Sequence, residues 1–322
     1  MKNKIFFLFI ILFLISSCSI DKNHKTKIMF IPKSMNSTFW EIVVEGFEAA
    51  TVEYNVYSEV RYPKTEEDYV RQIEIIEEAI NENFDAIILS AIHYEYLVNV
   101  VEKALNKGIE VVIIDSDVNE QNIKTRISTN NYNAVYKMGE QTAKDINFSG
   151  TVGLLMVDKT AKNDFDRMQG YINALSQYSN IKIVHNQNTL PDMIDAEENT
   201  LKIIEMHPDI TALATYNEIT TMGMGQAIEK SKRDDIYCIG FDNNTILVDY
   251  LEQGIFDSLI VQNQFAMGYL GCEYAIKLLH NKSVSSRVDT GVHVITKETM
   301  FTSKTQTILF PFEEDITNQL FK

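Results

Sequence analysis

The chain has 322 residues and a formal net charge of −16 at pH 7. This length is sufficient for two lobes that each bury a hydrophobic core. The acidic charge argues against a nucleic-acid-binding protein, because phosphate groups and an acidic surface repel one another. No helix-turn-helix pattern precedes the first predicted strand, which begins near Lys27.

The N-terminus has the pattern of a secretory signal peptide. Two lysines are the only charged residues within 1–17, an apolar run of eleven residues covers 5–15, and two serines precede Cys18. The apolar run is too short to cross a bilayer as a helix. Residues 15–18 resemble the lipobox of bacterial lipoproteins, in which the cysteine becomes lipid-modified and forms the new N-terminus. We expect a signal peptide at 1–17 and a lipidated tether at 18–26, with an ordinary cleaved signal as the alternative.

Lipidation at Cys18 predicts a protein held on the extracytoplasmic side of a membrane, at the cell surface or in the periplasm. Two or more acyl chains are needed for stable anchoring. Removal of residues 1–17 also removes two lysines, so that the formal net charge becomes −18.

After the tether, apolar strand-like runs alternate with stretches of helical periodicity. The predicted strands are 28–31, 56–61, 86–90, 111–115, 152–157, 181–185, 213–216, 237–241 and 259–262. The predicted helices are 39–52, 69–81, 94–106, 136–146, 167–178, 197–206 and 218–229. This alternation predicts parallel sheets with helices on both faces. It pauses at 126–133, which we interpret as a crossing between two lobes.

Polar residues stand at the predicted carboxyl ends of strands, where open α/β sheets bind ligands. Asp242 follows the apolar strand 237–241, and Gln262 ends the strand 259–262 after one short helix. Two neighbouring strands therefore offer polar groups at one edge of a sheet.

Several short motifs, taken together, resemble the type I periplasmic solute-binding proteins of the ribose-binding kind. The similarity extends from about residue 27 to about residue 300, and its motifs are weak singly but specific in their order and spacing. They are Pro-Lys-Ser-Met-Asn-Ser-Thr-Phe-Trp at 32–40, Ile-Ile-Asp-Ser at 113–116, Arg-Met-Gln-Gly-Tyr at 167–171, Asn-Glu at 217–218, Gly-Phe-Asp at 240–242, Val-Gln-Asn at 261–263, Asp-Thr-Gly-Val at 289–292 and Val-Ile-Thr-Lys-Glu at 294–298.

The resemblance implies two Rossmann-like α/β lobes with parallel sheets, joined by three crossings that form a hinge. The crossings are expected near 128–130, 262–264 and 291–293. The N-terminal lobe would then comprise 27–128 and 263–291, and the C-terminal lobe 129–262 and 292–312. In such proteins a ligand that touches both lobes only in the closed form drives closure.

The resemblance also implies a monosaccharide site between the lobes. The implied ligand-binding residues are Lys33, Ser37, Phe39, Trp40, Asp115, Ser116, Arg167, Asn217, Asp242 and Gln262. Carboxylates accept hydrogen bonds from sugar hydroxyls, the amide and guanidinium groups donate them, and the aromatic rings cover the C–H face of a sugar. This chemistry fits a neutral, polyhydroxylated ligand.

Four of these residues also have simple structural explanations in their local sequence. Asp242 and Asn217 can cap the helices that follow them. Trp40 lies at helical spacing from apolar residues and can be core, and Arg167 can form a surface ion pair with Asp166.

The chain departs from the ribose-type pattern at two positions, which makes ribose itself doubtful and leaves another pentose, a hexose or a modified sugar. Ribose-type receptors commonly have Asp-Arg where this chain has Asp115 and Ser116, so one cationic group is missing, and Lys33 can compensate for it. Ser37 stands where the ribose-type pattern has an asparagine.

The sequence predicts neither catalysis nor a bound metal or cofactor. Its six histidines lack metal-ligand spacing, and no serine lies in a nucleophile elbow. The glycines Gly223 and Gly225 lie within a helical pattern, so they do not form a dinucleotide-binding turn. We expect Cys238 and Cys272 to be buried free thiols, with a disulfide as the alternative.

Two partners fit a receptor of this kind. It can deliver sugar to a membrane ABC importer, which is the usual role of the family, or present its closed form to a membrane histidine kinase. A sugar-responsive repressor is contradicted by the signal segment and by the absence of a DNA-binding pattern.

Overall fold

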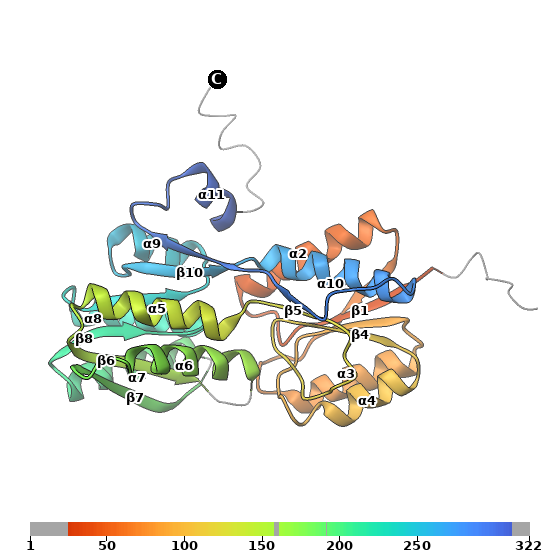
Figure 1. The fold of residues 1–322 in the computed structure, drawn as a ribbon, viewed down its shortest axis with the longest axis horizontal. Helices are drawn as coiled ribbons and strands as arrows, with labels where there is room; N and C mark the ends of the chain where they lie inside the picture. Colours follow the sequence, from red (N-terminus) through yellow and green to blue (C-terminus); the bar gives the residue numbers. More distant parts are fainter. Residues whose placement is uncertain (1–24, 158–160, 191, 311–322) are drawn as a thin grey trace, which may run out of the picture.

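The structure is a computed structural model that describes residues 25–157, 161–190 and 192–310. Its chain forms two α/β lobes that lie side by side (Figure 1). The predicted signal peptide, most of the tether with Cys18, and residues 311 and 312 of the predicted C-terminal lobe lie outside the described residues. The predicted fold class, two Rossmann-like lobes with parallel sheets, is confirmed.

The sheet of the first lobe has six parallel strands in the order β11-β5-β4-β3-β1-β2. Their bounds are Lys27–Ile31 (β1), Tyr57–Val60 (β2), Ala86–Leu89 (β3), Glu110–Ile114 (β4), Arg126–Ser128 (β5) and Arg287–Asp289 (β11). Strands β1 and β3 are buried on both sides, so their runs of apolar residues serve two cores at once.

The sheet of the second lobe repeats this arrangement in the order β12-β10-β9-β8-β6-β7. The strands are Gly150–Val157 (β6), Ile181–Thr189 (β7), Ile210–Ala214 (β8), Tyr237–Phe241 (β9), Ser258–Gln262 (β10) and Val292–Thr296 (β12). Only β12 is antiparallel to its neighbour among the described strand pairs.

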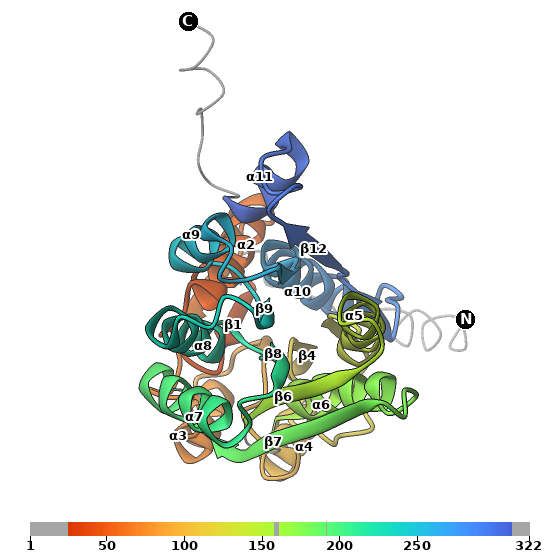
Figure 2. The ribbon, with the colours of Figure 1, turned by 90° about the vertical axis from the view of Figure 1, so that its left-hand side faces the viewer.

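Helices cover both faces of each sheet. In the first lobe α2 (Thr38–Glu53) and α10 (Gln264–Leu279) share one core with the sheet, and α3 (Tyr69–Asn81) and α4 (Val98–Asn106) share the other. In the second lobe α5 (Asn131–Asp145) and α6 (Lys162–Leu175) cover one face. The other face carries α7 (Met193–Met206), α8 (Glu218–Ser231) and α9 (Thr245–Gln253), as Figure 2 shows, together with α11 (Ser303–Leu309).

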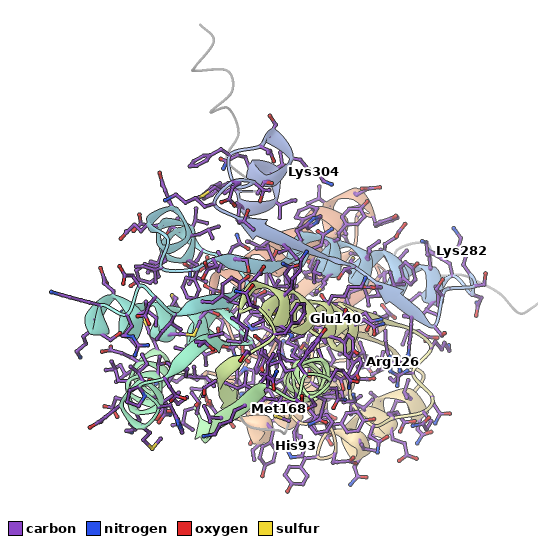
Figure 3. The ribbon with its side chains drawn as sticks, turned by 60° about the vertical axis from the view of Figure 1, so that its left-hand side comes forward. His93, Arg126, Glu140, Met168, Lys282 and Lys304 are labelled. Carbon is purple, nitrogen blue, oxygen red and sulfur yellow. The ribbon has the colours of Figure 1, made fainter. Side chains whose placement is uncertain are left out.

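Side chains fill the space between these layers (Figure 3). Met168 of α6 lies in the second-lobe core, whereas Lys282 and Lys304 project outward. Two buried thiols, Cys238 and Cys272, are free, as expected.

Local sequence explains most helix boundaries and also where the predicted ones are wrong. Helix α5 begins at Asn131, five residues before its predicted start, because Asn130 caps it by accepting the N–H of Asn133. Helix α4 begins at Val98 because a turn precedes it, in which His93 Nδ1 accepts the N–H of Glu95. The predicted starts of α6 and β8 were also late, by five and three residues.

The chain passes between the two sheets three times: from β5 to α5, from β10 to α10 and from β11 to β12. The second passage is anchored by very close packing of α10 on α2. A Cβ atom on Gly268 would lie 1.8 Å from the carbonyl oxygen of Val43, and one on Gly46 would lie 2.1 Å from that of Phe265. Only glycine permits this approach.

Candidate ligand-binding site

A cavity lies between the lobes, at the carboxyl ends of strands from both sheets. Nine of the ten predicted ligand-binding residues line it; Ser116 does not. Ser116 is fully buried beside the cavity, and its Oγ has no hydrogen-bond partner among the described residues. The lining residues are Lys33, Ser37, Phe39, Trp40, Glu66, Asp115, Asn163, Asp164, Arg167, Asn217, Glu218, Ile219, Asp242 and Gln262.

Asp115 and Asp242 occupy equivalent positions in the two lobes. Each follows the third strand of its sheet, β4 or β9, and each has a left-handed backbone, with φ of 52° and 67°. Each donates its N–H to the next strand, Asp115 to Ile127 O at 3.1 Å and Asp242 to Ile260 O at 2.8 Å. The same turn therefore delivers one carboxylate from each lobe into the cavity.

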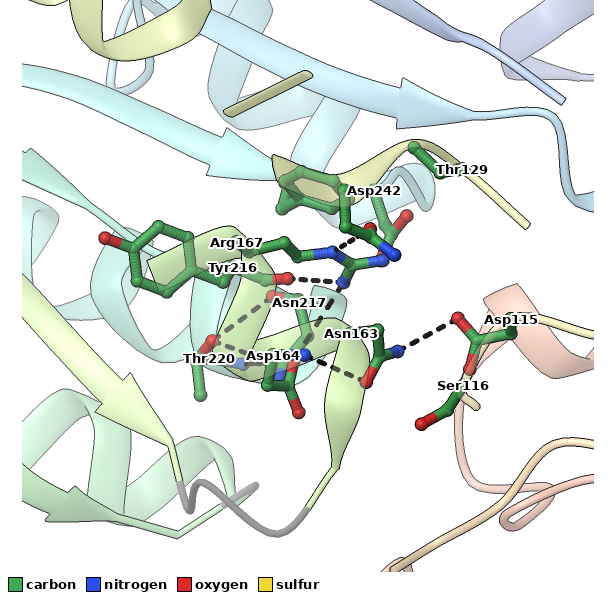
Figure 4. Close-up of polar contacts among 12 residues, drawn as sticks. Asp115, Ser116, Thr129, Asn163, Asp164, Arg167, Tyr216, Asn217, Thr220 and Asp242 are labelled. Carbon is green, nitrogen blue, oxygen red and sulfur yellow. Dashed lines mark hydrogen bonds and ion pairs between the residues drawn. The ribbon is translucent and has the colours of Figure 1, made fainter. Parts of the chain in front are cut away.

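Arg167 is buried and joins three elements of the second lobe around one guanidinium group (Figure 4). It donates to Asn131 Oδ1 at 2.7 Å, to Tyr216 O at 2.7 Å and to Gln262 Oε1 at 2.9 Å. Its guanidinium carbon also lies 4.1 Å from the centre of the Phe241 ring. The surface ion pair considered from the sequence is wrong, since it is Lys162 that pairs with Asp166.

Gln262 fixes the position of Asp242. Its Nε2 donates to Asp242 Oδ1 at 2.8 Å, while its Oε1 accepts from Thr129 and Arg167. Burial raises the pKa of Asp242 to about 7, and nearby Arg167 and the hydrogen bond from Gln262 oppose this shift. Asp242 does not cap α9; Asn244 does, by accepting the N–H of Leu247.

Lys33 lies at the first-lobe wall, as the hypothesis of a compensating cation requires. Its Nζ lies 2.9 Å from Glu66 Oε2 and 3.9 Å from Asp115 Oδ2. Burial lowers the pKa of Lys33, but Glu66, Asp115 and Asp164 together raise it above its ordinary value. Burial likewise raises the pKa of Glu66, yet Lys33 and its hydrogen-bond donors outweigh this and lower it.

The remaining predicted residues combine structural roles with a place in the cavity wall. Phe39 and Trp40 pack edge to face, with ring centroids 4.9 Å apart, and belong to the first-lobe core. Asn217 caps α8 by accepting the N–H of Thr220 at 3.0 Å. Ser37 precedes α2 without forming a side-chain cap. For Trp40 and Asn217 the structural explanation holds, and both also face the cavity.

Five lining residues were missed by the sequence analysis: Glu66, Asn163, Asp164, Glu218 and Ile219. The spacing of Asn163 and Asp164 from Arg167 on one helix places all three on one face, and this signal was available. Asn163 Nδ2 donates to Asp115 Oδ1 at 3.0 Å and so connects the lobes. Glu66 has no local signal, because it lies in the loop after β2.

The described residues contain no cluster of three or more side chains suited to hold a metal ion. Within the same residues, no helix is both long and apolar enough to cross a bilayer. The cavity wall combines many polar side chains with the aromatic rings of Phe39 and Trp40, a lining that suits a small polar ligand.

Comparison with known proteins decides the family. Residues 28–283 match the model of the periplasmic binding protein domain. This chain belongs to the periplasmic binding protein family. The resemblance to its type I sugar-binding members is thereby confirmed, as is the prediction that the protein is not an enzyme.

Individual family members are similar along most of the chain. A D-ribose/D-allose-binding protein of Pseudomonas aeruginosa is 26% identical over 297 residues, which are 88% of this chain and 92% of that protein. A D-apiose import binding protein of Paraburkholderia graminis is 26% identical over 198 residues, 61% of this chain and 64% of that protein. A solved ABC transporter solute-binding protein of Agrobacterium vitis with bound D-fucose has a TM-score of 0.84 and 28% identity, and the match covers 88% of this chain and 99% of that chain.

Proposed function

We propose that this protein is an extracytoplasmic receptor that binds a monosaccharide, a pentose, hexose or derivative, between its two lobes. The observation that carries the proposal is a cavity to which Asp115 of one lobe and Asp242, Arg167 and Gln262 of the other all contribute. Relatives named for D-ribose, D-allose and D-apiose support a ligand of this class. Nine of the ten residues implied by the resemblance are proposed as its contacts; the tenth, Ser116, is buried behind the cavity wall.

The proposed lobes are 27–128 with 263–291 and 129–262 with 292–312. The three chain passages between the sheets support a hinge at these boundaries. Because contacts such as Asn163 to Asp115 exist only when the lobes meet, a ligand bound to both sides stabilises the closed form.

A thermal-shift screen against pentoses, hexoses and their derivatives tests the binding proposal. A ligand that binds only the folded protein raises the melting temperature by mass action, so at least one sugar at 100 times its Kd is expected to stabilise the protein by about 2.7 kcal/mol. If no sugar in the panel shifts the melting temperature at millimolar concentration, the proposed function is wrong.

The proposed partner is a membrane ABC importer, to which the closed receptor delivers its sugar. Relatives named as import binding proteins support this role. Affinity capture from membranes of the native host, with sugar present, is expected to recover permease subunits. Recovery of a histidine kinase instead would favour a sensory receptor.

The proposed location is the extracytoplasmic side of the membrane, through a lipid anchor on Cys18. Its support is the sequence pattern of residues 15–18 together with the family, whose members bind solutes outside the cytoplasm.

A further inference from the structure

The cavity between the lobes carries more negative than positive side chains. Five carboxylates line it, from Glu66, Asp115, Asp164, Glu218 and Asp242, against two cations, from Lys33 and Arg167. Three formal negative charges of the wall are thus not balanced within it. A neutral sugar cannot balance them, because hydroxyl groups bring no charge.

Three of the five carboxylates are already satisfied by the protein. Glu66 accepts from Trp40 Nε1 at 2.8 Å and pairs with Lys33. Asp115 accepts from Ser90 at 2.9 Å and Asn163 at 3.0 Å. Glu218 accepts hydrogen bonds from two backbone N–H groups at the start of α2 and from the side-chain amide of Asn244, whose Nδ2 lies at 2.8 Å.

The other two carboxylates have free acceptor capacity toward the cavity. Asp242 is 3% exposed, and within the described part of the chain it accepts one side-chain hydrogen bond, at Oδ1, so Oδ2 is unpartnered. Asp164 accepts no hydrogen bond from a described residue, and its nearest cation, Arg167 Nη1, is 4.0 Å from Oδ1. Burial raises the pKa of both carboxyl groups.

Arg167 donates no hydrogen bond to either of these two carboxylates, although its charge opposes the rise in the pKa of both. Its three hydrogen bonds go to Asn131, Tyr216 and Gln262, and its guanidinium carbon lies over the Phe241 ring. Asp164 and Asp242 both line the cavity, so their carboxylate oxygens without a hydrogen-bond partner among the described residues are available to a ligand there. A ligand group placed there must donate hydrogen bonds, and a positive charge on it is favoured.

We infer that the ligand is a monosaccharide bearing a protonated amino group, which lies against Asp164 or Asp242. An ammonium group supplies three hydrogen-bond donors and one positive charge, whereas a hydroxyl group supplies one donor and no charge. This inference rests on the proposed function, since it names the ligand class of the same cavity. It also fits a cavity wall to which Asp164 and Glu66 contribute carboxylates while Ser116 contributes no cation.

The test is calorimetric titration of the full chain with matched pairs of sugars at pH 7. The pairs are D-glucosamine with D-glucose, D-galactosamine with D-galactose and D-mannosamine with D-mannose; each neutral N-acetyl form is added, as are D-ribose and D-allose. At least one amino sugar is expected to bind about tenfold or more tightly than every neutral sugar. A neutral sugar that binds as tightly as the best amino sugar overturns the inference while the proposed function stands. If no compound binds, both are wrong.

Two isosteric variants separate charge from shape. Asp164→Asn is expected to weaken amino-sugar binding about tenfold more than it weakens binding of the neutral parent sugar, because asparagine keeps the shape of the side chain and loses its charge. Asp166→Asn is the matched control, because Asp166 lies on the same helix but does not line the cavity, and it is expected to change neither. An equal loss of affinity for both sugars in Asp164→Asn would show that Asp164 has a structural role and would contradict the inference. Thermal melts are used to check that both variants fold. If a variant does not fold, the titration of the wild-type protein with the sugar pairs still tests the inference.

Discussion

Glu218 in the second lobe accepts the N–H of Phe39 in the first lobe at 2.9 Å. Its other oxygen accepts the N–H of Thr38 at 3.2 Å, so one carboxylate caps the start of α2 from across the cleft. Ser37, the residue before this helix, forms no side-chain cap of its own. The unpaired N–H groups and the positive end of the helix dipole are therefore satisfied only while the lobes are closed.

Glu218→Ala is accordingly expected to weaken sugar binding by about 1–2 kcal/mol through loss of the closed form, without unfolding either lobe. Calorimetry gives the affinity, and small-angle scattering of the ligand-free protein gives its dimensions, which are expected to increase. A variant with unchanged affinity and unchanged dimensions would show that this contact does not hold the lobes together.

The candidate ligand contacts are not equal in their effect on the fold. Asp115→Ala is expected to cost about 2–4 kcal/mol of sugar affinity and to lower the melting temperature only slightly, because only the side chains of Ser90 and Asn163 lose an acceptor. Arg167→Ala is expected to cost as much affinity and also to lower the melting temperature, because the buried acceptors on Asn131, Tyr216 and Gln262 lose their donor. Full affinity in both variants would place the sugar elsewhere.

Much of this arrangement was predictable, since strand periodicity and the polar residues at strand ends indicated Asp242 and Gln262, and the resemblance implied Asp115. Less predictable was how each residue is used. Asp242 and Asn217 both precede helices, and the sequence alone did not show that Asn217 caps its helix while Asn244 caps the helix after Asp242. Glu66 was missed because its place depends on Lys33 and Trp40, which are distant in sequence.

The raised pKa of Asp242 predicts a pH-dependent stability of the ligand-free protein. Between the ordinary pKa of an aspartate and about 7, the folded protein keeps a proton that the unfolded chain has released, so the free energy of unfolding falls as pH rises. Asparagine does not ionise, so the Asp242→Asn variant does not lose stability in this way as the pH rises. It is expected to be more stable than the wild type at pH 8, by on the order of 2 kcal/mol, and the difference is expected to shrink at pH 5.

Urea denaturation at the two pH values measures this difference. Asparagine can still accept the hydrogen bond from Gln262 at its Oδ1, so the comparison isolates the charge. A variant that is less stable than the wild type by the same amount at both pH values would contradict the assignment of the shift to Asp242.

Anchoring at Cys18 is tested independently of the cavity. Cys18→Ala is expected to release the protein into the medium or periplasm, or to leave its precursor unprocessed, because no thiol remains to be acylated. Fractionation of cells followed by immunoblotting locates the protein. Membrane retention equal to that of the wild type would refute the lipid anchor.

The chain has a single tryptophan, Trp40, and it lines the cavity. Its intrinsic fluorescence therefore reports directly on whether sugar enters between the lobes. Titration with a sugar that raises the melting temperature is expected to give a saturable change in Trp40 emission, which is lost in the double variant Asp115→Ala, Asp242→Ala. A sugar that stabilises the protein yet leaves Trp40 emission unchanged would contradict binding at this site.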